Sequence, residues 1–219
     1  IKFNTERGDF GLKISHSFLG SDFSIYGFSY QDRLPLYFID TTQLNFFQLH
    51  LLERHERLNT VGLTGALDIQ GFIIRFETLR HLNKSINYMS GSTLDKYKSD
   101  EQVNVVSLDF PSWGHWNFTL QFSDRNLQKS HAGLLISRYQ PSWSFRISRL
   151  FSNEQRLDLM GSYSGDDQGM LSHLEYIWPR TRTYDLRFGG EFFSGPPESL
   201  FGSKKDLSYV FAKIHAYFR

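Results

Sequence analysis

Histidine and acidic side chains are the groups of this sequence that could support catalysis or bind a metal. The chain has eight histidines, and His50 and His55 flank Glu53 in the order H-x-x-E-x-H. A zinc-binding helix of the H-E-x-x-H type needs its two histidines four positions apart, so that both imidazoles lie on one helical face. The spacing of His50 and His55 does not provide that face. We therefore predict no metal site.

Hydrolytic chemistry would need a nucleophile beside a general base, or a pair of acids. His131 precedes Ser137 in the sequence, and Asp166 is followed directly by Asp167. Glycines on either side of the two aspartates favour a turn, with cation binding as the weaker alternative. The sequence has no cysteine, no glycine-rich phosphate loop and no nucleotide fingerprint. We predict that the protein is not an enzyme, has no catalytic residues and uses no cofactor.

The elements that carry these residues follow from an alternation of apolar and polar residues with a period of two, which is typical of β-strands. One example is the segment in which Trp116, Phe118, Leu120 and Phe122 alternate with Asn117, Thr119, Gln121 and Ser123. We count about twelve such segments, near residues 10–18, 22–30, 57–67, 72–80, 102–110, 116–123, 131–139, 143–151, 156–164, 170–178, 183–194 and 207–218. We expect His115, His131, His173 and His215 to lie on separate strands, with no partner near them in the sequence.

Turn residues separate most of these segments, so consecutive strands should form an antiparallel meander. Two connections are long. Residues 31–56 could hold a short amphipathic helix around Leu44–Leu52 or an extended loop, and residues 81–101 are polar. Counted back from the C-terminus, both long connections fall on the same side of the sheet as the short turns. We favour a miscounted strand between residues 123 and 143 over an unusual barrel.

Composition narrows the class further. The 219 residues suit one all-β domain, 1–219, and the mean hydropathy is −0.40. No run approaches the roughly 18 apolar residues of a spanning helix, so a helical membrane protein is excluded. Aromatic residues make up 16% of the chain and are spread over many segments, as in barrels with aromatic girdles. The net charge of +1, with interspersed signs, argues against nucleic acid as a partner.

Opposite charges stand in the middle of the polar faces, as expected for a hydrated barrel lumen rather than a soluble core. The candidate lumen-lining residues are Arg75, Glu77, Gln121, Arg146, Glu175, Asp185, Arg187, Glu191 and Lys213. Their role is either a structural ladder of ion pairs or the setting of ion preference along a solute path. We predict an antiparallel up-and-down transmembrane β-barrel of about 12 strands, with a range of 10–14, or a part of a larger barrel.

The last residues resemble the terminal strand of Gram-negative outer-membrane proteins. In residues 206–218 apolar side chains alternate and end on Tyr217-Phe218, which the resemblance identifies as a candidate assembly signal. Further short segments are similar to a poorly characterised porin-like family of exporters: Gly8–Ile14, Leu34-Pro35-Leu36, Arg75-Phe76-Glu77, Leu120-Gln121, Leu174-Glu175-Tyr176, Phe192–Gly195 and Leu200-Phe201-Gly202. Members of that family are usually longer, so the chain would be a short version or a C-terminal portion.

The resemblance implies passage or export of a small or amphiphilic solute through the bacterial outer membrane. Its implied partners are outer-membrane lipid and lipopolysaccharide, the barrel-assembly machinery during biogenesis, and other envelope proteins. The leading hypothesis is therefore a channel or porin-like exporter. The first alternative is a barrel that anchors a complex and has no open pore. The least favoured alternative is a membrane-embedded hydrolase that uses histidine with serine or aspartate at the rim.

Overall fold

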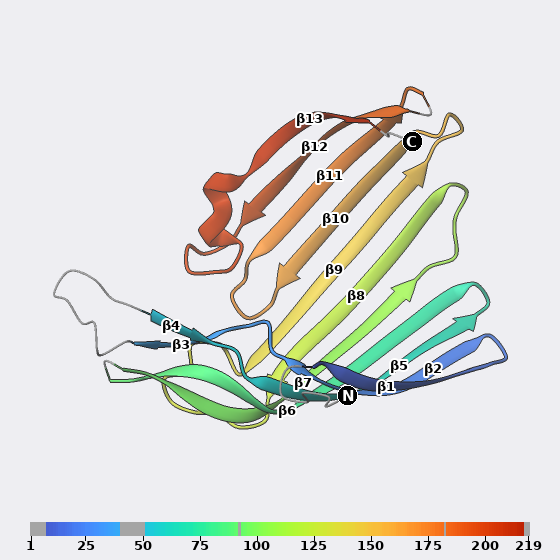
Figure 1. Ribbon diagram of the computed structural model, residues 1–219. Coiled ribbons are helices and arrows are strands. Elements are labelled where there is room, and N and C mark those ends of the chain that lie inside the picture. The colour runs from blue at the N-terminus through green and yellow to red at the C-terminus, as the bar shows by residue number, and fades with distance from the viewer. Residues whose placement is uncertain (1–7, 40–50, 92, 182, 217–219) are drawn as a thin grey trace. The chain divides into compact units, whose positions relative to one another are not determined.

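The protein is an all-β structure, and its computed structural model describes residues 8–39, 51–91, 93–181 and 183–216 (Figure 1). The described residues form thirteen strands and one short 3-10 helix. The strands are β1 (Phe10–Phe18), β2 (Ser21–Gln31), β3 (Leu36–Ile39), β4 (Leu51–Arg54), β5 (Arg57–Ile69), β6 (Phe72–Ser90), β7 (Thr93–Asp109), β8 (Trp116–Leu127), β9 (Tyr139–Leu150), β10 (Arg156–Ser164), β11 (Met170–Pro179), β12 (Tyr184–Ser194) and β13 (Tyr209–Ala216); the helix is η2 (Gly202–Leu207). Among these residues, no helix combines the length and the apolar character needed to cross a membrane.

Eleven of the strands form one antiparallel sheet in chain order, and β3 pairs with β4 in a small second sheet. Two hairpins have two-residue turns in which both residues have positive φ. These turns are Leu19-Gly20, with φ of 47° and 76°, and Gln70-Gly71, with φ of 55° and 85°. Paired positive φ values are those of a type I′ turn, whose twist matches that of the strands on either side. The predicted antiparallel meander is confirmed.

The strand prediction was wrong at two places, and both errors concern the ends of hairpins. Residues 128–138 are a connection, and a single strand, β9, replaces the two segments predicted at 131–139 and 143–151. The polar stretch 81–101 is not a loop, because β6 and β7 continue through most of it. Some of its polar residues pair along the hairpin, as Lys84 does with Glu101. The favoured explanation, a miscounted strand between 123 and 143, is confirmed.

With this correction all the long connections fall at one end of the strands. Because neighbouring strands alternate in direction, connections alternate between the two ends of the strands. The turns after β1, β5, β7, β9 and β11 are all short, whereas the other end has the longer connections after β2, β8 and β12 together with short turns after β6 and β10. The longest, residues 32–56, contains β3 and β4. The possible helix around Leu44–Leu52 lies mostly outside the described residues, but Leu51 and Leu52 belong to strand β4.

The predicted closure into a barrel is not present among the described residues. The sheet is open, with β1 and β13 as its outer strands. With eleven strands, β1 and β13 run in the same direction, so that direct pairing between them would be parallel and would break the antiparallel pattern.

Contacts divide the chain into two units, each of which is described by itself. The first unit comprises residues 1–65, 77–104 and 125–139, and the second comprises residues 66–76, 105–124 and 140–219. In the second unit, paired positions of β9 to β13 form rows across the sheet. One such row is entirely apolar or glycine, and consists of Ile147, Leu159, Leu174, Gly190 and Val210.

The apolar row is open to the surroundings. The exposed fraction is 43% for Leu174 and 77% for Val210, and Ile214 on the same face is 74% exposed. The rows on the other face of the same strands carry mostly charged and hydroxyl side chains. This part of the sheet is therefore a single layer with one apolar face and one polar face, and the polar face holds the candidate site.

Candidate functional site

All nine predicted lumen-lining residues lie on the polar faces of their strands. Arg146 pairs across the sheet with Met160, then His173, then Glu191. Glu175 pairs with Asp158, and Arg187 pairs with Lys213. Arg75, Glu77, Gln121 and Asp185 are placed there by the contacts described below. That this face encloses a lumen remains a prediction. The predicted assembly signal, Tyr217 and Phe218, lies outside the described residues.

Asp158 organises the ion pairs of β9 and β10. Its side chain is 7% exposed, and it accepts hydrogen bonds from two arginines. Arg156 reaches both carboxylate oxygens, with Nε–Oδ2 at 2.7 Å and Nη2–Oδ1 at 2.9 Å, whereas Arg146 reaches only Oδ1, at 3.1 Å. The group of three therefore carries one net positive charge.

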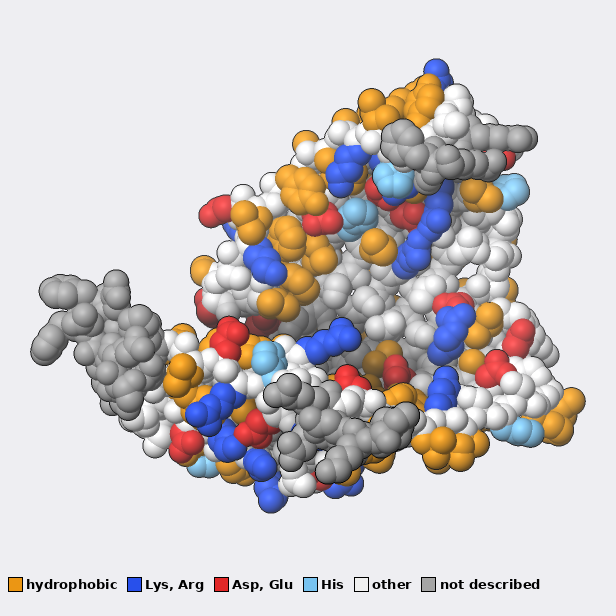
Figure 2. All heavy atoms as spheres, viewed as in Figure 1, with side chains coloured by type: hydrophobic (Ala, Val, Ile, Leu, Met, Phe, Trp, Pro, Cys, Tyr) orange, Lys and Arg blue, Asp and Glu red, His pale blue; other side chains and the backbone are white. Residues whose placement is uncertain are grey.

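On β11 and β12, by contrast, two carboxylates lie beside one arginine. Arg187 donates to both oxygens of Asp185, at 2.9 and 3.1 Å, and lies 3.9 Å from Glu175. His173 lies 3.3 Å from Glu191 on the neighbouring strand. Figure 2 shows basic side chains beside acidic ones and histidine over these strands. A face with alternating charge excess can hold water and orient charged solutes along its length.

Arg75 belongs to the second unit and pairs with Asp109, which also accepts a hydrogen bond from Thr119 at 2.9 Å. In the first unit, the Tyr26 hydroxyl donates to Glu77 at 2.6 Å, and the Tyr26 ring covers Gly62. Glycine is needed at position 62, because a Cβ there would lie 2.5 Å from that ring. The alternation in the sequence predicted that Arg75 and Glu77 lie on the polar face, but it did not predict their partners.

A buried charge cluster in the first unit was missed by the sequence analysis. Glu101 is 1% exposed and lies 2.6 Å from Lys84, in direct contact with Arg125 and 3.7 Å from His81. His81 also contacts the hydroxyl of Thr60 at 2.7 Å. Because residues 81–101 were expected to form a loop, their charges were not assigned to a face. If the predicted hairpin had been extended through residues 81–101, alternation would have placed Glu101 on the same face of its strand as Ser99 and Val103.

Two connections pack against the hairpin of β6 and β7. In the first of these contacts, the side-chain oxygen of Asn87 accepts the backbone N–H of Tyr37 at 2.9 Å, and the side-chain nitrogen of Asn87 donates to the carbonyl oxygen of Tyr37 at 2.8 Å. Glu56 contacts Lys96 and Ser85, and the hydrogen bond from Lys96 holds the pKa of the Glu56 carboxyl below its ordinary value. On the other side, the Met89 amide donates to Gly133 at 2.8 Å. The hairpin is therefore supported by both neighbouring connections.

The residues considered for catalysis or metal binding are not brought together. His131 lies in a connection rather than on a strand, where it contacts the rings of Tyr88 and Tyr97 at 4.3 and 4.9 Å. In the part of the chain that the structure describes, no hydrogen bond joins His131 to Ser137. His115 also lies in a turn, and His50 is outside the described residues. No cluster of three potential metal ligands occurs among the residues described.

Asp166 and Asp167 form a turn, as the favoured interpretation predicted. Asp167 accepts the backbone N–H of Leu200 at 2.6 Å and that of Gly169 at 3.1 Å, and so ties the connection after β10 to the connection after β12. Donation from Leu200 is the main reason that the pKa of the Asp167 carboxyl lies below its ordinary value. The carboxylate therefore stabilises loop structure, which does not require a bound cation.

This geometry predicts a loop transition at acidic pH. Because the folded-state pKa of Asp167 is depressed, its stabilisation is present above the unfolded pKa of about 3.9 and is lost as the pH falls through the folded value. We expect the hydrogen-exchange protection of the Leu200 amide, relative to its intrinsic rate, to decline below about pH 4. Asp167→Asn should remove this pH dependence, whereas Asp166→Asn should retain it. Equal protection of Leu200 at pH 3 and pH 6 would contradict the assignment.

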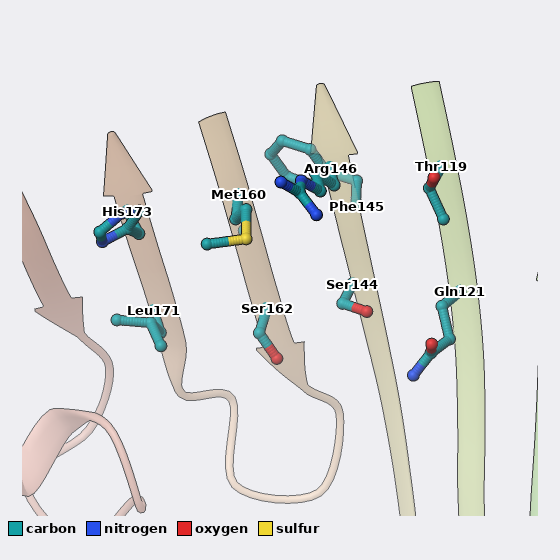
Figure 3. A pocket seen from close by; sticks show the side chains of 10 residues that line it. Thr119, Gln121, Ser144, Phe145, Arg146, Met160, Ser162, Leu171 and His173 are labelled. Carbon is teal, nitrogen blue, oxygen red and sulfur yellow. The ribbon is translucent and has the colours of Figure 1, made fainter. Parts of the chain in front are cut away.

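A hollow of about 360 Å³ opens on the polar face of the second unit (Figure 3). Four neighbouring strands, β8 to β11, supply its lining. The polar lining residues are Thr119, Gln121, Ser144, Arg146, Ser162 and His173. Met160 and Leu171 contribute apolar surface between them. Among the described residues, the lining contains a cation and a histidine but no carboxylate.

Comparisons with protein-family models, with curated proteins and with solved structures found no match to this chain. Its function is therefore argued from the two faces of the sheet and from the hollow.

Proposed function

We propose that this chain is an outer-membrane β-barrel protein, or a portion of one, that passes small or amphiphilic solutes along its polar face. The observation that carries the proposal is the single-layer sheet of β9 to β13, which has exposed apolar rows on one face and ion-paired rows on the opposite face. Water on both sides would leave the large apolar side chains of that face exposed, with Val210 at 77% and Ile214 at 74%, whereas soluble proteins rarely expose contiguous apolar patches. Lipid on one side and a hydrated lumen on the other satisfy both faces.

The connections support the same arrangement. Outer-membrane barrels have short periplasmic turns and longer external loops; in this sheet the long connections after β2, β8 and β12 all fall at one end, and the other end has short turns alone. The residues at the short-turn end also resemble a membrane interface. Arg180 lies 4.4 Å from the ring centroid of Trp178, and Arg149 lies 4.9 Å from that of Trp116. Aromatic residues with adjoining cations are typical of the headgroup region.

Strands β6 and β7 extend beyond the length that a membrane requires. They have 19 and 17 residues, whereas a tilted spanning strand needs about 9–11. Arg80 and Asp100, which lie 2.8 Å apart, occupy the face that carries Ile74 and Phe76 nearer the short turn. An ion pair at that level supports an outer part of the hairpin in water. Closure of the barrel with antiparallel pairing throughout would require an odd number of further strands between β1 and β13.

The channel hypothesis predicts ion conduction. When the purified full chain is incorporated into a planar lipid bilayer, we expect discrete conductance steps in potassium chloride. The control is the same preparation unfolded in denaturant before addition, which should give none. Folded protein that resists denaturation in vesicles and yet gives no conductance steps would exclude the channel.

The Glu101 cluster specifically favours the second candidate, an anchoring barrel without an open pore. Glu101, Lys84 and Arg125 fill part of the polar face in the first unit with buried, paired charge, where an open channel would hold water. For this candidate we expect absent conductance together with a partner protein that co-purifies in fixed stoichiometry from outer membranes.

A further inference from the structure

The hollow on the polar face of the second unit combines one under-compensated cation with adjacent apolar surface. We propose that it binds a small amphiphilic carboxylate, with the carboxylate at Arg146 and the hydrocarbon portion over Met160 and Leu171. This proposal rests on the proposed function, because the carboxylate bound in the hollow would be the class of solute that the polar face passes.

Arg146 is the only formal cation among the described residues that line the hollow. Its partner Asp158 already receives two hydrogen bonds from Arg156, at 2.7 and 2.9 Å, and takes from Arg146 only the single contact at 3.1 Å. A guanidinium has five N–H donors, and the Arg146 side chain is 47% exposed. Its remaining donors can thus reach a second carboxylate, which arginine binds with favourable planar geometry.

The register of the strands fixes the direction of the bound molecule. Arg146 on β9 pairs with Met160 on β10, and Met160 pairs with His173 on β11. His173 in turn lies beside Glu191, whose negative charge disfavours a carboxylate at that end. The carboxylate therefore binds at the β9 end of the hollow, and the chain points toward β11.

Apolar and hydroxyl side chains share the rest of the hollow (Figure 3). Ser144 pairs with Ser162, and Ser162 pairs with Leu171. Strands are about 4.8 Å apart, so a ligand that reaches from Arg146 to Leu171 crosses roughly 10 Å. This distance suits an alkyl carboxylate of intermediate length better than acetate, which could contact only the arginine and the nearest serine.

The test measures hexanoate binding to the full chain folded in detergent micelles, by titration calorimetry. We expect Arg146→Gln to weaken hexanoate binding about tenfold or more, as loss of a charge-assisted hydrogen bond predicts. Asp158 keeps Arg156 in this variant, so the fold should persist. The matched control is Arg80→Gln, because the Arg80 side chain is 45% exposed and also pairs with one aspartate. That control should change hexanoate affinity by less than about twofold.

A second comparison tests the apolar part. Acetate should bind the unaltered chain at least about tenfold more weakly than hexanoate, and Leu171→Ser should weaken hexanoate without changing acetate. Equal affinities of the Arg146→Gln and Arg80→Gln variants, or equal binding of acetate and hexanoate, would overturn the proposal. Hexanoate binding in a protein that forms no conducting pore would retain the site and reject the channel. Conductance without hexanoate binding would support the channel and reject the proposed binding site.

Discussion

Replacement of Leu120 by arginine should destabilise the folded protein in lipid vesicles by about 2–4 kcal/mol. Leu120 lies in β8 between Phe118 and Phe122, and the Phe122 ring packs 4.4 Å from that of Trp143. Its side chain belongs to the apolar face and is 43% exposed. If this face contacts lipid, the guanidinium must leave water for hydrocarbon. The measurement is a denaturant titration of folding into phospholipid vesicles, followed by tryptophan fluorescence.

Gln121→Arg is the matched control, because the same residue is introduced one position along the same strand on the opposite face. Gln121 lines the hollow of the polar face, where a further cation remains hydrated, so we expect a change below about 1 kcal/mol. On a water-exposed surface, Leu120→Arg would also fall within about 0.5 kcal/mol. Equal stabilities of the two variants would therefore reject lipid contact at the apolar face.

Replacement of Glu101 by glutamine should cost about 3–5 kcal/mol of folding free energy, because it removes the buried negative charge that Lys84 and Arg125 share. The side chains of Lys84 and Arg125 are 10% and 25% exposed, and both contact the Glu101 carboxylate. Glutamine preserves the shape of the side chain, so the loss reports on charge rather than on a cavity. The free energy of unfolding, measured by the same vesicle titration, should fall by this amount.

Asp109→Asn provides the control on the same strand. Asp109 pairs with Arg75, but the two side chains are 23% and 49% exposed, so that solvent compensates for the lost charge and the cost should stay below about 1 kcal/mol. The double variant Lys84→Met with Glu101→Gln also removes one of the two cations around this position and should recover part of the loss. A Glu101→Gln protein as stable as Asp109→Asn would show that the cluster is hydrated rather than buried.

The sequence predicted the faces correctly within the strands, but it was less informative at the ends of the strands. Within strands, a period of two assigns each residue to a face whatever its partner, which is why Arg146, Asp185 and Lys213 were placed on the polar face from the sequence. At the ends the pattern is weaker. Residues 81–101 have polar side chains on both faces, as a hairpin beyond the apolar band would, and polarity alone made them resemble a loop. Residues 131–139 contain an apolar run, but Gly133 has a positive φ of 82° there.

The partners of the charged residues could not be predicted, since they depend on register. A shift of one residue would exchange the faces, and a shift of two would keep the faces but give Asp158 different neighbours. Turn geometry sets the register in tight hairpins, but Lys84, Glu101 and Arg125 are joined across three strands and two connections. The hollow is a similar case, because Arg146, Ser162 and His173 meet only through two successive registers.

The sequence by itself determined that this protein is an antiparallel all-β chain with one apolar and one polar face, because alternation is a local property of each strand. It also indicated which residues could carry charge on the polar face. Only the tertiary structure decided which carboxylate meets which cation, that Arg146 is left under-compensated beside an apolar surface, and that the strand count leaves β1 and β13 running in the same direction. These properties depend on pairing between distant segments, and the free energy of such pairing is not encoded in any single segment.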